Sequence, residues 1–210
     1  QGHLFFRIMD IVNQHSPKII FLENVRNIFK KETFKVIEDA LDKDYLCART
    51  LINAKGWVPQ KRIRAFMLFF RRDSFTPDYV FHHCQSHLDK LAARGTENEV
   101  PFSKIREKNP SKEEYQIPEG TWKSLQRHKE RHSKEKRGFG YGIVDDAKAT
   151  RTLSARYHKD GAEILIEEPD WDQPRKVTIG EGLKLMGYNK SFAKKYGFKH
   201  GFLFPEKLSK

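Results

Sequence analysis

The sequence predicts an α/β fold for about the first 73 residues, followed by a smaller mixed domain that contains β structure. Two segments repeat apolar residues at helical spacing, and three short apolar runs have the length and composition of strands. Their alternation favours a parallel sheet covered by helices. The third observation is a change of character after Arg72, where the chain becomes polar and rich in charge.

The first helix is predicted over residues 3–16, because the apolar residues of this segment fall on one helical face. They are Leu4, Phe5, Ile8, Ile11 and Val12. Pro17 ends the helix, and residues 19–24 follow as a buried strand.

A second helix is predicted over residues 32–43, where Phe34, Ile37 and Leu41 repeat the same pattern. The sequence then predicts a strand over 45–52, a loop through Gly56 and Pro59, and a strand over 65–70.

Residues 74–137 are polar and lack long periodic segments, except for a helix-like run over 120–137. Strand-like runs at 149–158 and 162–168 follow, and the Asp160-Gly161 pair between them is a strong hairpin signal.

A last short helix is predicted over residues 178–188. Thr178 is a suitable N-cap, and Glu181, three residues later, is its capping-box partner.

The composition points to a polyanionic partner. The chain has 210 residues and a net charge of +12, and lysine and arginine gain affinity for nucleic acid by displacing counterions. A solvated basic surface is the alternative.

The two cysteines form no disulfide framework, so a reducing compartment is expected. No apolar run approaches the roughly 20 residues of a membrane helix, and no signal peptide is predicted. Because the first residue is Gln1, the chain is expected to begin inside a longer protein.

Glu23 and Asn24 come at the end of a predicted strand, which is where open α/β sheets bind ligands. A carboxylate there could pair with a ring nitrogen and an exocyclic amine together. The alternative is a Glu-Asn pair that caps a strand-to-helix turn.

Arg62 and Arg64 alternate where the next strand begins, so they are expected to share one face. A strand that enters a buried sheet rarely opens with two such arginines unless they meet an anion or a carbonyl. The alternative is an exposed edge strand with solvated charges.

Three other features are interpreted as structural. Gly138–Gly142 imitates a cofactor loop but precedes a strand-like segment rather than a helix, so a DNA-facing loop is preferred. The bunched His82, His83, Cys84 and His87 have no second ligand pair, so no metal site is predicted. Cys47 is expected to be a buried, inert thiol.

Together these segments resemble the DNA cytosine-5 methyltransferases. Phe21–Val25 resembles their Glu-Asn-Val motif, and residues 58–70 resemble their Gln-x-Arg-x-Arg motif. Residues 175–188 resemble the later R-x-x-T-x-x-E-x-x-x-L-x-G-[FY] motif. Residues 138–144 and 150–167 are similar to the Dcm type of bacterial methylase, which marks CC(A/T)GG. The resemblance implies part of a Rossmann-like methyltransferase sheet followed by a target-recognition domain.

The resemblance also predicts three parts and two missing motifs. The parts are the end of the catalytic domain (1–73), a target-recognition domain (74–190) and a segment that returns to the catalytic domain (191–210). The family's Phe-x-Gly-x-Gly loop for S-adenosylmethionine and its Pro-Cys nucleophile do not occur in the sequence. Methyl transfer from S-adenosylmethionine is therefore expected only in the complete enzyme, and the chain alone is expected to be inactive.

The family assigns roles to the matching residues of its base pocket. Glu23 would share or donate a proton to N3 of a flipped cytosine, and Arg64 would hold the base carbonyl. Arg62 would support it or the nucleotide backbone, and Asn24 and Gln60 would support the pocket.

For DNA reading, the choices are Arg151, Thr152, Arg156 and Tyr157, on the strand predicted before the Asp-Gly turn. One of the two arginines is expected to read a guanine and the other to be structural or to touch phosphate.

Three hypotheses remain open at this point. The first is a fragment or subunit of a methyltransferase that acts on double-stranded DNA in the bacterial cytoplasm at the nucleoid, with a complementary polypeptide as a candidate partner in a restriction-modification system. The second is a non-catalytic, sequence-specific DNA-binding module derived from such an enzyme. The third is an unrelated basic RNA-binding protein. The retained Glu-Asn-Val and Gln-x-Arg-x-Arg motifs favour the first.

Overall fold

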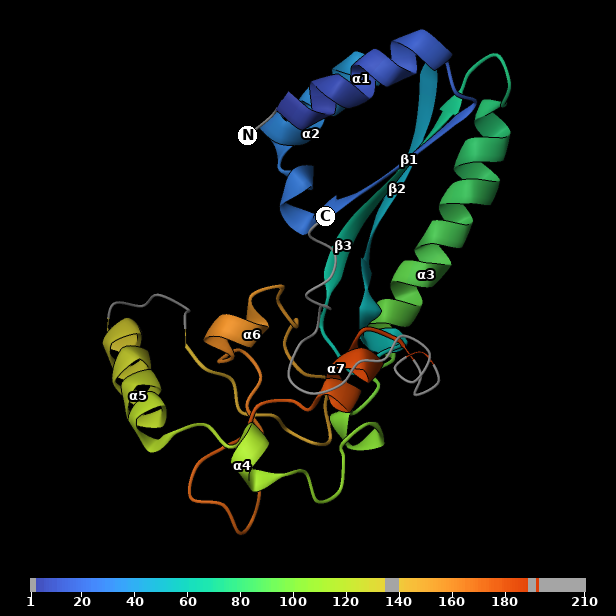
Figure 1. The fold of residues 1–210 in the computed structure, drawn as a ribbon. Coiled ribbons are helices and arrows are strands. Elements are labelled where there is room, and N and C mark those ends of the chain that lie inside the picture. The colour runs from blue at the N-terminus through green and yellow to red at the C-terminus, as the bar shows by residue number, and fades with distance from the viewer. Residues whose placement is uncertain (1–2, 135–139, 189–191, 193–210) are drawn as a thin grey trace. The chain divides into compact units, whose positions relative to one another are not determined.

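The computed structural model describes residues 3–134, 140–188 and 192. The chain divides into two compact units (Figure 1). The first unit contains Gln1–Asn53 and Ile63–Glu97, and the second contains Ala54–Arg62 and Asn98–Lys210. The predicted segment 191–210 lies outside the described residues, except for Phe192.

The first unit is built on a three-stranded sheet of β1 (Ile19–Val25), β2 (Tyr45–Asn53) and β3 (Ile63–Arg71). Its order is β1-β3-β2, and both pairings are antiparallel. The five predicted elements of this unit are confirmed, but the expected parallel pairing is wrong. β1 and β2 run in the same direction on either side of a helical crossover, and β3 lies between them and runs the opposite way. The fold class remains α/β.

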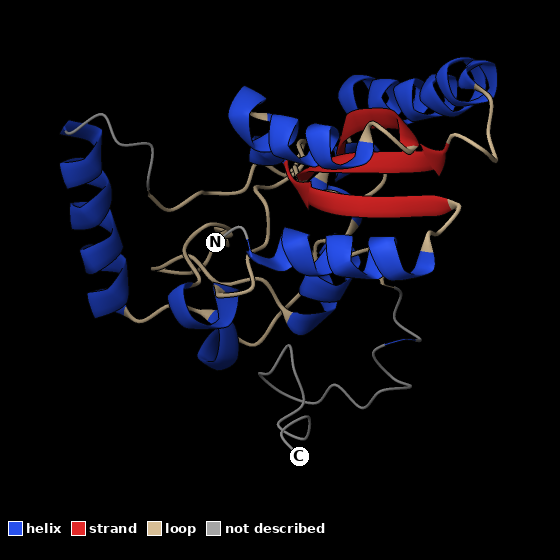
Figure 2. Cartoon of the chain, turned by 90° about the horizontal axis from the view of Figure 1, so that it is seen from above, coloured by secondary structure: helices blue, strands red, loops and turns tan. Residues whose placement is uncertain are grey.

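Helices cover both faces of this sheet (Figure 2). On one face, α1 (His3–His15) and α2 (Lys31–Leu41) pack over the side chains of Tyr45, Met67 and Phe69. A short 3-10 turn, η1 (Arg26–Phe29), lies between β1 and α2. The predicted apolar face of α1 is only partly used, because Val12 is buried whereas Leu4 and Ile11 remain exposed.

The opposite face is covered by the π-helical turn η3 (Tyr79–Cys84) and by α3 (Gln85–Glu97). Val80 and Leu88 pack there against Leu46, Ala48 and Phe70 of the sheet. α3 lies close to the backbone of β2, since a Cβ added at Gly95 would lie 2.5 Å from the carbonyl oxygen of Asn53. Residues 74–97 therefore belong with the sheet. The compact unit ends at Glu97, which differs from the boundary expected near residue 73.

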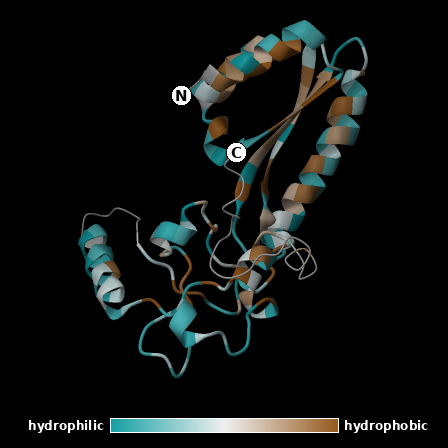
Figure 3. Ribbon diagram, in the orientation of Figure 1, coloured by the Kyte–Doolittle hydropathy of each residue, from teal (hydrophilic) through white to brown (hydrophobic). Residues whose placement is uncertain are grey.

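The second unit has one long helix, several short helical turns, and isolated β-bridges in place of named strands among its described residues. Its helices are α4 (Lys112–Tyr115), α5 (Glu119–Lys134), α6 (Tyr157–Asp160) and α7 (Ile179–Leu185), with 3-10 turns η2 (Ala54–Gly56) and η4 (Phe102–Lys104). Its core contains Phe102, Ile105, Leu153, Tyr157, Ile164, Ile166, Val177 and Leu185. The predicted capping box of Thr178 and Glu181 is confirmed at α7. Figure 3 shows α5 as largely hydrophilic.

The hairpin predicted around Asp160-Gly161 is wrong. Gly161, at φ +47°, ends the helical turn α6 instead of forming a two-residue strand turn. The neighbouring backbone pairs elsewhere: Ile143 bridges Leu165, Ile166 bridges Arg175, and Thr150 bridges Gln60. Because each run has its own partner, the two runs do not pair with each other.

Within the described part of the chain, no helix has both the length and the apolar character needed to cross a bilayer.

Candidate base pocket and DNA-recognition residues

Glu23 and Arg64 form an ion pair in the first unit. Antiparallel register places Val25 of β1 opposite Arg64 of β3, so Glu23 lies within reach of the guanidinium. The Nε of Arg64 is 3.0 Å from Oε1 of Glu23. The structure thus brings together two residues that lie 41 positions apart and that the sequence assigned to one pocket.

The pair remains accessible at the end of the sheet. The side chain of Glu23 is 46% exposed and that of Arg64 is 20% exposed. Within the described residues, the carboxylate of Glu23 therefore stays open to solvent. Asn24 contributes to the backbone here, because its Oδ1 accepts a hydrogen bond of 2.8 Å from the amide of Val25.

Arg62 does not share a strand face with Arg64. β3 begins at Ile63, and Arg62 belongs to the second unit, where its carbonyl accepts a hydrogen bond from the amide of Ala54. The expectation of two same-face strand arginines is therefore wrong, because the chain enters β3 one residue after Arg62.

Gln60 is a buried connector of the second unit, with 1% of its surface exposed. Its Nε2 donates to the carbonyl of Leu185 at 2.7 Å, and its Oε1 accepts from the amide of Leu153 at 2.8 Å. Both ends of the amide are satisfied by backbone groups far away in sequence. In this structure both hydrogen-bonding groups of the Gln60 side chain therefore hold the backbone of the second unit.

The four DNA-reading choices fall in two groups. Tyr157 is 3% exposed, and its hydroxyl donates to the carbonyl of Ile164 and accepts from the amide of Val177. Thr152 donates to the carbonyl of Lys61. Tyr157 is therefore a core residue, in contrast to the prediction that its side chain contacts DNA.

The two arginines of this group are exposed. Arg151 donates from Nη1 to the carbonyl of Gly140 at 2.9 Å, and Arg156 is the N-cap residue of α6. The strand-face alternation expected between them does not apply, because the segment from Arg151 to Tyr157 is not a strand.

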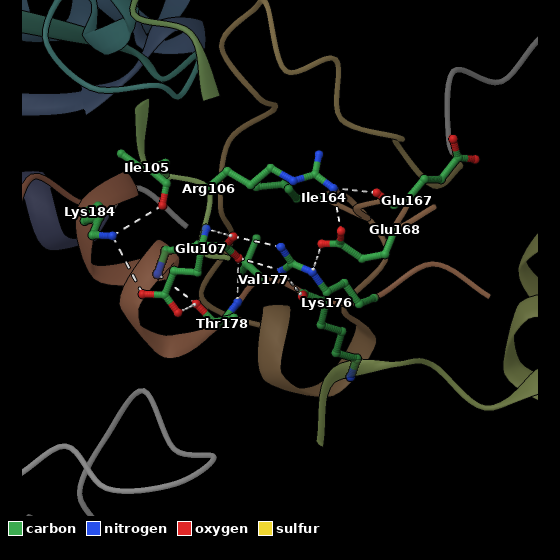
Figure 4. A network of polar contacts seen from close by, with 12 residues as sticks. Ile105, Arg106, Glu107, Ile164, Glu167, Glu168, Lys176, Val177, Thr178 and Lys184 are labelled. Atoms are coloured by element: carbon green, nitrogen blue, oxygen red, sulfur yellow. Dashed lines mark hydrogen bonds and ion pairs between the residues drawn. The ribbon is translucent and has the colours of Figure 1, made fainter. Parts of the chain in front are cut away.

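A buried ion network lies within the second unit (Figure 4). Arg175 and Glu181 are fully buried, and two hydrogen bonds of 2.7 and 2.9 Å join the guanidinium to the carboxylate. The Nε of Arg175 also bonds Glu168 at 2.6 Å. Burial alone would lower the pKa of Arg175, but these carboxylates outweigh it and raise the pKa.

The same network reaches Arg106 and Glu107. Arg106 bonds Glu168 at 2.9 Å as well as Asp146, while Glu107 accepts from the hydroxyl of Thr178 at 2.8 Å. The sequence identified Thr178 and Glu181 as a cap but not Arg175 as their buried partner. The R-x-x-T-x-x-E spacing carries the available signal, because it places these three residues at intervals of three.

Cys47 lies on β2 and packs against the first core. Burial raises the pKa of its thiol to about 12, so it is protonated at neutral pH and is a poor nucleophile. Among the described residues, no three His, Cys, Asp or Glu side chains are grouped to hold a metal ion.

Residues 1–200 match the family of C-5 cytosine-specific DNA methylases. The chain belongs to this family. It is 36% identical over 198 residues to the type II methyltransferase M1.ScrFI of Lactococcus lactis subsp. cremoris, a match that covers 91% of the chain and 48% of that protein. It is 33% identical over 220 residues to the DNA-cytosine methyltransferase of Escherichia coli K12, covering 90% of the chain and 45% of that enzyme.

The chain spans about half the length of the curated relatives it matches. Solved structures agree on the fold. The S. pombe Dnmt2 methyltransferase superposes with a TM-score of 0.62 at 16% identity, covering 90% of the chain and 61% of that protein. An Entamoeba histolytica methyltransferase, EhMeth, superposes with a TM-score of 0.55 at 21% identity, covering 88% of the chain and 55% of that protein.

Proposed function

We propose that this chain is the part of a DNA (cytosine-5-)-methyltransferase that holds a flipped cytosine and recognises the DNA target. The observation that carries this proposal is the Glu23–Arg64 pair at 3.0 Å, on the two motifs that resemble the family's base pocket. A structural ion pair alone would not need to stay accessible, whereas a pocket that receives a base does.

The chemistry of the pair suits cytosine. A carboxylic acid at Glu23 can donate to N3, and its second oxygen can accept from the exocyclic amine. The Arg64 guanidinium can donate to the carbonyl oxygen, where negative charge grows when a nucleophile adds to carbon 6. The target base must leave the duplex to meet these groups. Arg62 would contact the flipped nucleotide's phosphate or sugar, and Asn24 would fix the backbone beside Glu23.

The nucleophile and the methyl donor would be held elsewhere in the complete enzyme. Members of this family use S-adenosylmethionine. The described residues do not fit the family's glycine-rich cofactor loop, since Gly140–Gly142 leads to a bridge at Ile143 rather than into a helix. No step of methyl transfer is therefore assigned to these residues.

A complementary polypeptide or segment would complete the sheet at β1. This strand lies at the edge of the order β1-β3-β2, so one side of its backbone is unpaired within the described sheet. Its side chains are also unusually apolar for an edge, with Phe21 60% exposed and Ile19 and Val25 half exposed. Exposed apolar edges are normally covered or blunted, which favours an added strand here.

The purified chain is expected to transfer no methyl group to DNA. Cys47 is a protonated, largely buried thiol, and neither Cys47 nor Cys84 follows a proline as the family's nucleophile does. The chain would be incubated with labelled S-adenosylmethionine and duplex DNA, with a complete methyltransferase as positive control. Label in DNA above the protein-free blank would contradict this prediction.

Arg151 and Arg156 are the proposed contacts to the DNA target. Both are exposed in the recognition unit, whereas Tyr157 beside them is in the core. The resemblance of residues 150–167 to the Dcm type suggests CC(A/T)GG as the sequence read. Arginine is the commonest reader of guanine in the major groove.

Substitution of each arginine by Ala is expected to separate a base contact from a phosphate contact. Substitution of the arginine that contacts a base should weaken DNA binding by roughly 1–3 kcal/mol. It should relax discrimination only at the base pair that this arginine contacts. Substitution of the arginine that contacts a phosphate should weaken binding to all DNA sequences alike. It should also reduce the slope of log affinity against log salt concentration by about 0.9. Binding of the chain would be measured on every single-base variant of CC(A/T)GG at several salt concentrations. Uniform losses from both substitutions would reject a base-reading role for either arginine.

The second candidate function is a non-catalytic DNA-binding module. It is favoured by the charge of +12 and by the basic, hydrophilic surface of α5. It gives no role to the Glu23–Arg64 pair, so substitution at Glu23 distinguishes the two functions.

A further inference from the structure

We propose that His128 and His132 of α5 form a chelating site for a divalent transition-metal ion of the Cu²⁺ or Ni²⁺ type. Both histidines lie on α5 and are four residues apart, so their side chains leave the same face of the helix. Their Nε2 atoms are 2.9 Å apart and their ring centroids 4.1 Å apart. This site is separate from Glu23 and Arg64 and does not depend on the proposed function.

The separation of the two nitrogens matches one coordination geometry. Metal–nitrogen bonds to histidine are about 2.0–2.1 Å, so two such bonds meeting at 90° span about 2.9 Å. Tetrahedral bonds of the same length span about 3.4 Å. Right angles between neighbouring ligands are typical of square-planar or tetragonal sites, which Cu²⁺ and Ni²⁺ prefer. Water would fill the remaining positions.

In the absence of metal, one imidazole can donate Nε2–H to the other. Such a contact needs one protonated and one unprotonated nitrogen facing each other. For a metal ion to bind both Nε2 atoms, the donating ring must carry its proton on Nδ1 instead, and both rings then present Nε2 lone pairs.

The basic neighbours of the pair are partly directed elsewhere. Lys129 places its Nζ 4.1 Å from the centroid of the Tyr141 ring, and Arg127 donates from Nε to the carbonyl of Lys123 at 3.4 Å. Their charges lower the affinity for a cation but do not occupy the nitrogens of the pair.

The chain contains a second histidine pair at the same spacing, which serves as a matched control. His83 and His87 are also four residues apart, but a ring nitrogen of His87 contacts the carbonyl of His83 at 2.8 Å. The ring of His83 lies beside Tyr79 instead, with centroids 5.8 Å apart. The same sequence spacing therefore does not place two ring nitrogens together there.

The test is a titration of the purified chain with Cu²⁺ and Ni²⁺, followed by calorimetry and, for copper, by electron paramagnetic resonance. One tight site with nitrogen ligands is expected. His128→Ala and His132→Ala should each weaken binding by at least about tenfold, because the second bond of a chelate forms intramolecularly. The double variant His83→Ala/His87→Ala should leave the site unchanged. Circular dichroism would verify that each variant keeps its helices.

Zn²⁺ should bind more weakly than Cu²⁺, and Mg²⁺ should not compete, since it prefers oxygen ligands. The proposal is overturned if wild-type chain and His128→Ala bind copper equally, or if only the His83/His87 variant loses the tight site. A hydrogen bond between the two rings would then be the sole role of the contact.

Discussion

Replacing Glu23 by Gln is expected to reduce methyl transfer by about 10²–10⁴-fold in a complete methyltransferase that contains this chain. Glutamine keeps the size and shape of the side chain but cannot donate a carboxylic proton to N3 of the base. It also loses the ionic attraction to Arg64, at 3.0 Å in this structure. DNA affinity should change much less, because the proposed DNA contacts, Arg151 and Arg156, lie on other residues. Single-turnover rates and DNA dissociation constants would be measured on the same preparations.

The matched control for this change is Glu32→Gln, on the exposed surface of α2 in the same unit. It removes one carboxylate without touching the pair and should leave turnover near that of the wild type. Arg64→Ala should lower turnover, whereas Lys61→Ala should be mild, because Lys61 forms only a surface ion pair with Glu99 at 3.4 Å. Wild-type turnover in Glu23→Gln would remove the proposed role and leave the DNA-binding module as the better function.

The second large effect is expected on stability. Glu181→Ala leaves the Arg175 guanidinium without the carboxylate that makes two hydrogen bonds to it in a fully buried site. Breaking a buried pair in this way costs about 3–5 kcal/mol. All three tryptophans, Trp57, Trp122 and Trp171, belong to the second unit, so their fluorescence during urea unfolding reports on that unit alone.

Asp172→Asn is the control, because Asp172 pairs with Lys112 on the surface at 3.4 Å. It should cost less than about 1 kcal/mol. The double variant Arg175→Met/Glu181→Leu should recover only part of the loss, because it removes the unpaired guanidinium but leaves Glu168 and the backbone amides of Glu107 and Thr178 without these partners. Equal losses from Glu181→Ala and Asp172→Asn would show that the buried network does not stabilise the unit.

The buried ion network also predicts how the stability of the second unit changes with pH. Burial would raise the pKa of Glu168, but hydrogen bonds from Arg175 and Arg106 outweigh it and lower the pKa below the usual 4.5. A carboxylate whose pKa is lower in the folded state contributes stability above its unfolded pKa and loses that contribution as the pH falls through the folded pKa. The second unit should therefore lose stability in acid below about pH 4.5.

Local patterns predicted local structure well in this chain. The helical spacing in α1 and α2, the apolar runs of β1 to β3 and the cap at Thr178 each depend on neighbouring residues, and each was confirmed. Sheet order was not predictable in this way, because the place of β3 between β1 and β2 depends on pairing between distant segments. The hairpin at Gly161 failed for the same reason: Leu153 and Tyr157 are held by long-range partners that local turn chemistry does not contain.

The candidate site shows the same division. The motifs placed Glu23 and Arg64 in one pocket, and register brings them to 3.0 Å. The motifs did not indicate that the side chains of Gln60 and Tyr157 would be buried. The sequence alone does not distinguish an amide or phenol that bonds backbone groups from one that binds a ligand. Only the identity of the partners, Leu153 and Leu185 for Gln60, separates these cases.

The long-range hydrogen bonds of Gln60 also constrain the order in which this protein can fold during synthesis on the ribosome. Its two partners are 93 and 125 residues further along the chain. At about 5–20 residues per second, the segment 54–62 must wait roughly 6–25 seconds before Leu185 is synthesised. The strands that flank this segment can pair earlier, so the sheet would be assembled with an unfinished loop projecting from it. Nascent chains arrested before residue 185 should therefore carry a folded sheet and a protease-sensitive stretch between β2 and β3.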